Sequence, residues 1–288
     1  MRKEFEIVLN AVLTDSTPSI KNASIDELVK IAAKNKILLQ FLRVTQLDRK
    51  LLLLEEAKYR KFLENLALTQ ETLNNLDHVF IKLRKPVAYV PSDIDILIPR
   101  KLISKAVHRL MEKGFRIEVA EPYCITMTRN EAIIDLYIYP TLGGMIYVNT
   151  DKLLAYKEAI EFNDIEIQTL NPSAEALVIM AHSIYKERIY TLNDYITVSK
   201  WISKKTFRLA EELKCTKALM ISMEINKLVN SRKLILPYKI PLPLWIKILT
   251  NKVIEDDITR ATIINLIKSL RDRRAGKQII SKLTRQSY

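Results

Sequence analysis

The spacing of apolar residues changes twice along the chain, and this feature constrains the fold more than any other. From Arg2 to about Asn75 the chain has no glycine and one proline, and apolar residues recur three or four positions apart, which predicts helices. Ser24 or Asp26 is a candidate cap for the second of these helices. The segment from Glu55 to Leu76 is predicted to form one long amphipathic helix.

Between Val79 and Leu170 the pattern is one of short, β-rich runs bounded by proline and glycine. A helix is predicted over Lys101–Lys113, with Gly114 at its end. The order of strand, helix, strand and further strands predicts an α+β fold, with a small mixed sheet and helices on one face. The predicted strands are Val87–Val90, Ile94–Ile98, Arg116–Val119, Ile133–Tyr139 and Ile165–Leu170.

The same pattern divides the chain into three regions. Residues 1–78 are predicted to form an N-terminal helical region, residues 79–170 a core with the sheet, and residues 171–288 a C-terminal helical domain. The pair Asn171-Pro172 opens the first helix of the last region, which is predicted to run to about Arg188. On it, His182 is predicted to be a core or interface histidine. Tyr185, Lys186 and Arg188 are predicted to lie on a solvated face, with contact to a base and phosphates as the alternative.

Composition narrows the functional classes. With only four glycines in 288 residues, neither the P-loop nor the dinucleotide-binding fingerprint is present. The net charge of +13 favours attraction to polyanions such as RNA, DNA or nucleotide phosphates. No apolar run approaches the roughly 20 residues that cross a bilayer, and no signal segment is evident, so we expect a cytoplasmic protein with no membrane partner. Cys124 and Cys215 fit no paired metal spacing and predict buried, reduced thiols.

The most informative stretch is an acidic pair inside a predicted strand. Asp93 and Asp95 are two residues apart, so on a strand both side chains point to the same face. Ile94, Ile96 and Ile98 then face the other way and anchor the strand in the core. Two neighbouring carboxylates repel each other, and a cation is needed to neutralise them. Mg²⁺, or Mn²⁺, is the natural candidate because these ions prefer oxygen ligands.

A third carboxylate lies in another predicted strand. Asp135 interrupts an otherwise apolar run, where a lone charge is costly unless it is paired or bound to metal. If this strand pairs beside the first, Asp135 can lie across from Asp93 and Asp95. The three residues would then complete one metal site.

This arrangement of an Asp-x-Asp strand, a helix, a strand and a third aspartate resembles the nucleotidyltransferase (polymerase-beta-like) superfamily. The resemblance covers roughly Val79 to Leu170, and the run from Leu170 to His182 resembles the helix that follows the core in uncharacterised members. It implies that Asp93, Asp95 and Asp135 are metal ligands and catalytic residues, with Asp135 also a candidate base. The implied reaction is metal-dependent transfer of NMP from an NTP to an acceptor, in which one ion activates the attacking hydroxyl and another stabilises the leaving pyrophosphate.

One part of the family pattern is missing. Members usually place a Gly-Ser pair ahead of the Asp-x-Asp strand to hold the triphosphate, whereas this chain has the segment Phe80–Pro86. Lys82, Arg84 and Lys85 are predicted to replace that grip with charge, together with Ser92. The alternative is that the chain no longer performs the reaction.

As the acceptor, the net charge favours RNA, for example a tRNA end, over a small molecule or a protein hydroxyl. The C-terminal stretch is basic and has helical apolar spacing, which is typical of a helix that binds an RNA backbone. Lys277, Lys282 and Arg285 are the predicted nucleic-acid-binding residues. The alternative function is a catalytically inactive protein with the nucleotidyltransferase fold that binds nucleic acid.

Overall fold

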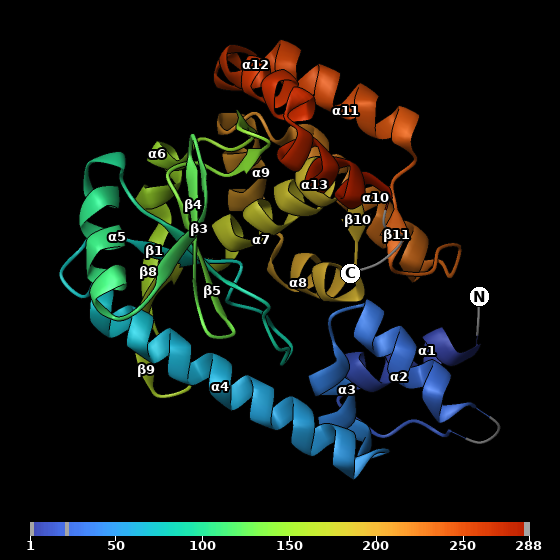
Figure 1. Ribbon diagram of the computed structural model, residues 1–288. Coiled ribbons are helices and arrows are strands. Elements are labelled where there is room, and N and C mark those ends of the chain that lie inside the picture. Colours follow the sequence, from blue (N-terminus) through green and yellow to red (C-terminus); the bar gives the residue numbers. More distant parts are fainter. Residues whose placement is uncertain (1–2, 21–22, 285–288) are drawn as a thin grey trace.

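A seven-stranded mixed sheet lies at the centre of the protein, in a fold that is 59% helical. The computed structural model describes residues 3–20 and 23–284 (Figure 1). The strand order is β3-β4-β5-β2-β1-β9-β8, in which β2 runs parallel to β5 and β1 runs parallel to β9. The strands are β1 (Val79–Ile81), β2 (Ile94–Leu97), β3 (Arg116–Glu121), β4 (Cys124–Arg129), β5 (Ala132–Tyr137), β8 (Lys157–Phe162) and β9 (Ile165–Leu170). The predicted α+β class with a mixed sheet is therefore confirmed.

One predicted strand is wrong. Residues 87–90 form no strand, and the chain instead pairs Val79–Ile81 with β2 and β9. The reason is that the backbone of Ala88 bonds to a helix. Its N–H donates to the side-chain oxygen of Gln40 at 3.1 Å, and its carbonyl accepts from the backbone N–H of Gln40 at 3.2 Å. The prolines at positions 86 and 91 flank this segment and further disfavour ladder pairing.

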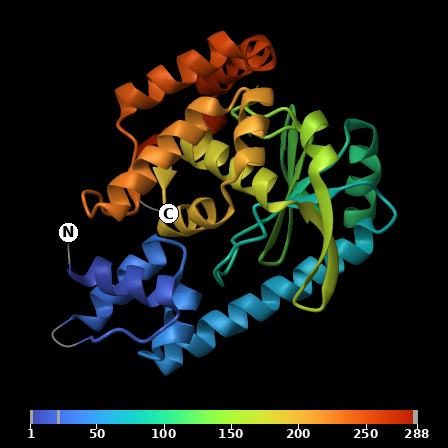
Figure 2. The same cartoon turned by 180° about the vertical axis from the view of Figure 1, so that it is seen from behind.

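Four helices precede the sheet, as the apolar spacing predicts. They are α1 (Lys3–Thr14), α2 (Ile25–Lys34), α3 (Leu38–Thr45) and α4 (Arg49–Leu73). Ser24 caps α2 by accepting from the N–H of Glu27 at 3.4 Å. The long helix begins earlier than predicted because Asp48 caps it, accepting from the N–H of Leu51 at 2.9 Å. It connects the small N-terminal bundle to the sheet, as both views show (Figure 1, Figure 2).

Helices cover both faces of the sheet, not one as predicted. On the first face, α4 and α5 (Ile103–Glu112) pack on side chains such as Phe80, Ile96 and Ile134. On the second face, the side chains of Val79, Leu97 and other strand residues join a core that also contains residues of α7 (Pro172–Ala181). The predicted core, residues 79–170, includes a helix of the first layer only. The second layer is missed because α7 follows the last strand of the sheet.

The C-terminal region is helical, as predicted. Asn171 caps α7 by accepting from the N–H of Ala174 at 3.1 Å, and a π-helix, η3 (His182–Glu187), continues it to Arg188. Two small two-stranded sheets complete the structure. One is the hairpin of β6 (Thr141–Leu142) and β7 (Met145–Ile146), and the other is the antiparallel pair of β10 (Ile189–Tyr190) and β11 (Tyr238–Lys239), which are far apart in the sequence. The remaining elements are η1 (Arg100–Leu102), α6 (Thr150–Leu153), η2 (Leu154–Tyr156), α8 (Leu192–Trp201), α9 (Lys204–Glu212), α10 (Thr216–Asn230), α11 (Leu242–Glu255), α12 (Asp257–Arg271) and α13 (Arg273–Thr284).

The β6–β7 hairpin fastens the C-terminal helices to the core. Gly143 and Gly144 form its turn with positive φ, and their carbonyls accept from the side chains of Ser269 and Asn265 of α12 at 3.0 and 3.2 Å. A Cβ atom on Gly144 would lie 2.9 Å from the Cβ of Asn265, which is too close. These two glycines therefore allow the hairpin and α12 to approach each other.

One apolar core runs through all three predicted regions. It contains Phe5 of α1, Leu97 of the sheet and Leu177 of α7, all fully buried. The strands of the large sheet do lie between Val79 and Leu170, but the division of the chain into three regions stays a prediction. Cys124 and Cys215 are buried and free, as expected. Within the described residues, no helix has the length and apolar character needed to span a membrane.

Candidate active site

Three carboxylates converge at the middle of the sheet. Asp95 of β2 lies directly beside Asp135 of β5 in the parallel register, and Asp93 immediately precedes β2. One oxygen from each of the three carboxylates lies within 4.8 Å of the other two. The predicted arrangement on neighbouring strands and one face is therefore confirmed. Ile94 and Ile96 point the other way into the core beneath α4 and α5, as the strand period requires.

Asp135 is held by hydroxyl groups. The Thr126 hydroxyl donates to its Oδ1 at 2.6 Å, and the Tyr137 hydroxyl donates to its Oδ2 at 2.9 Å. The Lys186 ammonium, from the π-helix, donates to the same Tyr137 hydroxyl at 3.2 Å and lies 5.3 Å from the centre of its ring. A side chain of the C-terminal region is thus connected to Asp135 through a single phenol.

Asp95 is paired with a buried lysine. Lys82 Nζ lies 2.7 Å from Asp95 Oδ1, and the two side chains are 15% and 6% exposed. Burial raises the pKa of Asp95 to about 7, and repulsion from Asp93 and Asp135 acts in the same direction against the attraction of Lys82. Burial alone would lower the pKa of Lys82, but the charges of Asp95 and Asp93 hold it above its usual value.

Asp93 is the more acidic member of the pair. Burial acts to raise its pKa, but the positive charges of Lys82 and Lys36 and a hydrogen bond from Ser92 hold that pKa below its usual value. The Ser92 hydroxyl donates to Asp93 Oδ1 at 3.1 Å. The pKa values of Asp93 and Asp95 therefore shift in opposite directions, because Asp95 is more deeply buried and Asp93 has more cations around it.

The segment that stands where a Gly-Ser pair is expected has an unusual backbone. Lys82 has a φ of +59°, a conformation uncommon for residues other than glycine, and its carbonyl accepts from the Tyr89 hydroxyl at 2.7 Å. Beneath the segment lies Glu175 of α7, which is fully buried. Burial lowers the pKa of Lys85 to about 8 and raises the pKa of Glu175 to about 7, while the attraction between the two opposes both shifts.

The three cations of this segment do not lie together. Lys82 and Lys85 line the same pocket as the carboxylates. Arg84 is absent from that pocket lining and points to the outer strand β8, where its NH1 lies 3.0 Å from Glu158 Oε2. Its guanidinium is also 5.6 Å from the ring centre of Trp201. The structure therefore brings two of the three predicted phosphate-binding cations to the site.

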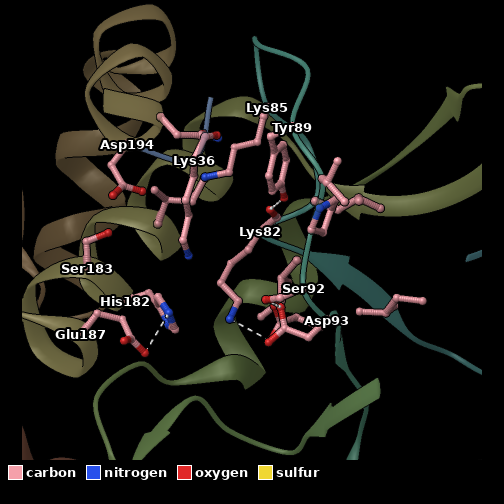
Figure 3. Close-up of a pocket in the computed structure, with 18 of the residues that line it drawn as sticks. Lys36, Lys82, Lys85, Tyr89, Ser92, Asp93, His182, Ser183, Glu187 and Asp194 are labelled. Atoms are coloured by element: carbon pink, nitrogen blue, oxygen red, sulfur yellow. Dashed lines mark hydrogen bonds and ion pairs between the residues drawn. The ribbon is translucent and has the colours of Figure 1, made fainter. Parts of the chain in front are cut away.

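The pocket itself has a volume of about 570 Å³, and its walls come from segments between Ala33 and Asp194 that are far apart in the sequence. Lys36 projects into it from the turn after α2, Lys82 and Lys85 come from the segment after β1, and Asp194 lies across from them on α8 (Figure 3). Volumes of this order are typical of sites for small molecules and cofactors. Ser92 lies at the side of the pocket beside Asp93, as Figure 3 shows.

Lys36 was not predicted, and its position depends on the neighbouring asparagine. Asn35 is fully buried and bridges distant segments, because its amide donates to the Leu236 carbonyl at 2.9 Å and accepts from the Leu192 N–H at 2.9 Å. The carbonyl of Lys36 accepts from the Asn193 side chain at 2.9 Å. The turn after α2 is thereby fixed against α8, which places the lysine in the pocket. No sequence signal marks such a long-range contact.

The π-helix contributes further residues that line the pocket. His182 Nδ1 lies 3.2 Å from the Tyr147 hydroxyl, and His182 Nε2 lies 3.5 Å from Glu187 Oε1. The histidine is thus satisfied by protein partners, as predicted. The prediction of a solvated face for the following residues is wrong, because Tyr185 and Arg188 are buried and Lys186 lines the pocket.

Two of the predicted RNA-binding residues belong to the last helix, α13. Lys277 is exposed on α13, and Lys282 belongs to the same helix. Arg285 lies outside the described residues. Lys277 does not line the pocket with the carboxylates.

The three carboxylates form a donor set that suits a hard divalent cation. All of the donors are oxygen atoms, which Mg²⁺ and Mn²⁺ prefer. Among the described residues, the buried Asp95 carboxylate forms an ion pair with one ammonium, that of Lys82. The carboxylates of Asp93 and Asp135 lie beside it and repel it. A bound cation would relieve this excess of negative charge, so the residues present fit a metal.

Residues 90–229 match the model of a protein family described as "uncharacterised nucleotidyltransferase". The matched segment includes the three carboxylates and Lys186 but begins after Lys82 and Lys85. No curated protein matches this sequence. Among solved structures, the solution structure of the antibiotic-resistance factor ANT(2'')-Ia is similar over 62% of this chain and 94% of that chain, with 13% sequence identity and a TM-score of 0.29.

Proposed function

Since this chain is a member of the nucleotidyltransferase superfamily, we propose that it transfers NMP from an NTP to a hydroxyl group of an acceptor. The observation that carries the proposal is the meeting of Asp93, Asp95 and Asp135 within 4.8 Å at the wall of a pocket that is also lined by lysines. Carboxylates supply metal ligands, and lysines supply point charges for a triphosphate. The two parts of the site suit the two parts of a metal–NTP complex.

In this proposal, Asp93, Asp95 and Asp135 hold Mg²⁺ or Mn²⁺. Such a metal, when bound, lowers the pKa of the attacking hydroxyl and stabilises charge on the leaving group. Lys36, Lys82 and Lys85 bind the triphosphate in place of the missing Gly-Ser pair, together with Ser92. Arg84 is left out of the proposed site because it points away from the pocket.

The proposed step is an in-line displacement at the α-phosphorus. A bond forms between the acceptor oxygen and that phosphorus, while the bond from phosphorus to the bridging oxygen breaks and its electron pair leaves with pyrophosphate. The proton of the acceptor hydroxyl passes to a carboxylate oxygen of Asp135. Thr126 and Tyr137 orient that carboxylate through the hydrogen bonds that they donate to it.

RNA is the proposed acceptor, because the chain carries a net charge of +13. The test is incubation of the protein with total RNA, Mg²⁺ or Mn²⁺, and each NTP labelled either at the α- or the γ-phosphate. We expect label on RNA from the α-labelled NTP only, since the γ-phosphate leaves with pyrophosphate. Asp95→Asn should abolish labelling. Glu166→Gln, which removes an exposed acid from β9 of the same sheet, should leave it unchanged.

A second candidate function is a non-catalytic nucleic-acid-binding protein. Two observations favour it, namely the absence of a Gly-Ser pair and the pairing of Lys82 with a would-be metal ligand, Asp95. In this case no NTP would be consumed with any metal or acceptor. RNA binding would still weaken with salt, and neutralising Lys277, Lys282 and Arg285 together would reduce the salt dependence by roughly one unit of slope for each phosphate that is no longer neutralised.

A further inference from the structure

A second, smaller pocket of about 160 Å³ lies beside the first. It is bounded by α4 on one side and by the beginning of β5 on the other. The two pockets have lining residues in common, which are Lys58 of α4 and the segment 90–94 that carries Ser92 and Asp93. One of the three carboxylates can therefore be reached from both pockets.

We infer that the smaller pocket receives the acceptor, and that this acceptor is the 3′-terminal nucleotide of an RNA strand. The inference rests on the proposed function. In-line displacement requires the attacking hydroxyl and the leaving pyrophosphate on opposite sides of the α-phosphorus. The larger pocket contains Lys36, Lys82 and Lys85 for the triphosphate, so the hydroxyl must arrive from another direction. The smaller pocket meets the larger one at Asp93, and none of these three lysines lines it.

The lining of the smaller pocket suits a nucleotide that carries a phosphate. Lys58 and Lys61 lie one turn apart on α4, and Asn65 follows one turn later with an amide that can donate and accept. Phe62 and Ile133 supply an apolar surface, of which the Ile133 side chain is 38% exposed. Ammonium groups, an amide and an apolar surface are the groups that bind the phosphate, the base edge and the base face of an unpaired nucleotide.

Both lysines have acidic partners. Lys58 Nζ lies 2.6 Å from Glu55 Oε1, and Lys61 Nζ lies 2.6 Å from Glu131 Oε2. The Lys61 and Glu131 side chains are 51% and 79% exposed, and such a pair contributes at most about 1 kcal/mol. A phosphodiester with a full negative charge can therefore displace Glu131 from Lys61. The Glu55 side chain is only 9% exposed, but an ammonium has three N–H donors, so Lys58 can keep this partner while it contacts a phosphate.

The RNA-binding site inferred here differs from the one that the basic C-terminal stretch predicts. Lys277 of α13 lines neither pocket, whereas Lys58 lines both. The end of the RNA is thus held by α4, and any contact with α13 involves nucleotides farther from the reacting hydroxyl.

The first test compares Michaelis constants in the transfer reaction. Lys61→Ala should raise KM for the RNA acceptor about tenfold, because it removes one group that binds a phosphate. KM for NTP should stay unchanged, because Lys61 lines only the smaller pocket. Ile133→Trp, which fills the smaller pocket, should raise the acceptor KM in the same way. Lys50→Ala is the matched control, because it removes an exposed cation from the same helix outside both pockets. If the protein transfers NMP and these variants leave the acceptor KM unchanged, the inference is wrong and the proposed function stands.

The second test needs no turnover. An RNA oligonucleotide with 4-thiouridine at its 3′ end is bound to the unmodified protein and irradiated, and the cross-linked peptides are identified by mass spectrometry. We expect cross-links within residues 58–65 and 131–133. Cross-links confined to α13, or none at all, would overturn the inference even where NMP transfer takes place. Transfer of label to a protein instead of to RNA would overturn it as well. Cross-links at the expected residues without any transfer would sink the proposed function and leave the binding site intact.

Discussion

The ammonium of Lys82 and the carboxylate of Asp95 form an ion pair of 2.7 Å at the base of the pocket, with little exposure of either side chain. Lys82 reaches this position from a backbone in the left-handed region, held by the Tyr89 hydroxyl. The lysine thus neutralises part of the negative charge of the three acids. In the proposed function, the same ammonium would bind the triphosphate once a metal ion neutralises the carboxylates.

Lys82→Met should therefore weaken both folding and nucleotide binding. At pH 8 and without metal, we expect the free energy of unfolding to fall by about 3 kcal/mol, because a buried carboxylate loses its partner. KM for NTP should rise about tenfold, because one charged group that binds the triphosphate is removed. Urea denaturation and steady-state kinetics measure the two effects. Arg84→Met is the control for KM, which should not change because Arg84 lies outside the pocket; an equal effect there would contradict the assignment.

The raised pKa of Asp95 predicts a pH dependence of stability in the metal-free protein. Between about pH 4, where an unfolded aspartate titrates, and about pH 7, the folded protein keeps a proton on Asp95 that the unfolded chain has lost. The folded state binds more protons in this window, so this group's contribution to the unfolding free energy falls as pH rises through it. Denaturation in EDTA at several pH values measures the slope, and Asp95→Asn should flatten it.

The same proton competes with a metal ion. Carboxyl ¹³C NMR in EDTA should show Asp95 titrating near pH 7 and Asp93 below its usual range. Saturating Mg²⁺ should remove the Asp95 transition from the neutral range, because a bound cation favours the ionised carboxylate. A spectrum of the three aspartates that does not respond to Mg²⁺ or Mn²⁺ would contradict the proposed metal site.

Tyr137→Phe tests the connection between the π-helix and Asp135. The substitution removes the hydroxyl that donates to Asp135 and accepts from Lys186, and it keeps the ring. We expect kcat for NMP transfer to fall by roughly 10-fold or more, as is usual when a partner of a metal ligand is removed, with KM for NTP little changed. Tyr139→Phe is the matched control, because that hydroxyl donates to Asp151, away from the carboxylates.

Mutation of the acids should separate catalysis from RNA binding. Asp135→Asn and Asp95→Asn each remove a charged ligand and keep the shape of the side chain, so transfer should fall by more than about 100-fold. RNA affinity should stay the same or increase, since a negative charge is removed. Filter binding and the transfer assay give the two readouts. A parallel loss of RNA binding would point to misfolding, which circular dichroism checks.

The positions of the three acids could be predicted from the sequence because they depend on local rules. A strand has a period of two, so the acids at positions 93 and 95 must share a face, and an acid in the apolar strand around position 135 must find partners. Parallel pairing of β2 with β5 then places Asp95 beside Asp135. These requirements hold whatever the rest of the chain does.

Other residues of the pocket, such as Lys36, could not be predicted, because their positions depend on contacts between distant segments. Lys36 is brought to the site by the bonds of Asn35 with residues about 160 to 200 positions away, which no periodicity encodes. Lys186 follows an α-helix that turns into a π-helix at His182, and the wider turn changes which residues share a face. The failed strand at residues 87–90 has a similar cause, since its backbone bonds to a helix rather than to the sheet.

The bonds of Asn35 have an evolutionary consequence. This side chain is fully buried and lines neither pocket, yet it fixes the turn from which Lys36 projects. In the proposed function, nucleotide affinity would therefore depend on a position that lines neither pocket. Descendants of this chain that exchanged Asn35 for an apolar residue would have to recover the missing charge from another segment, so we expect positions 35 and 36 to be inherited together.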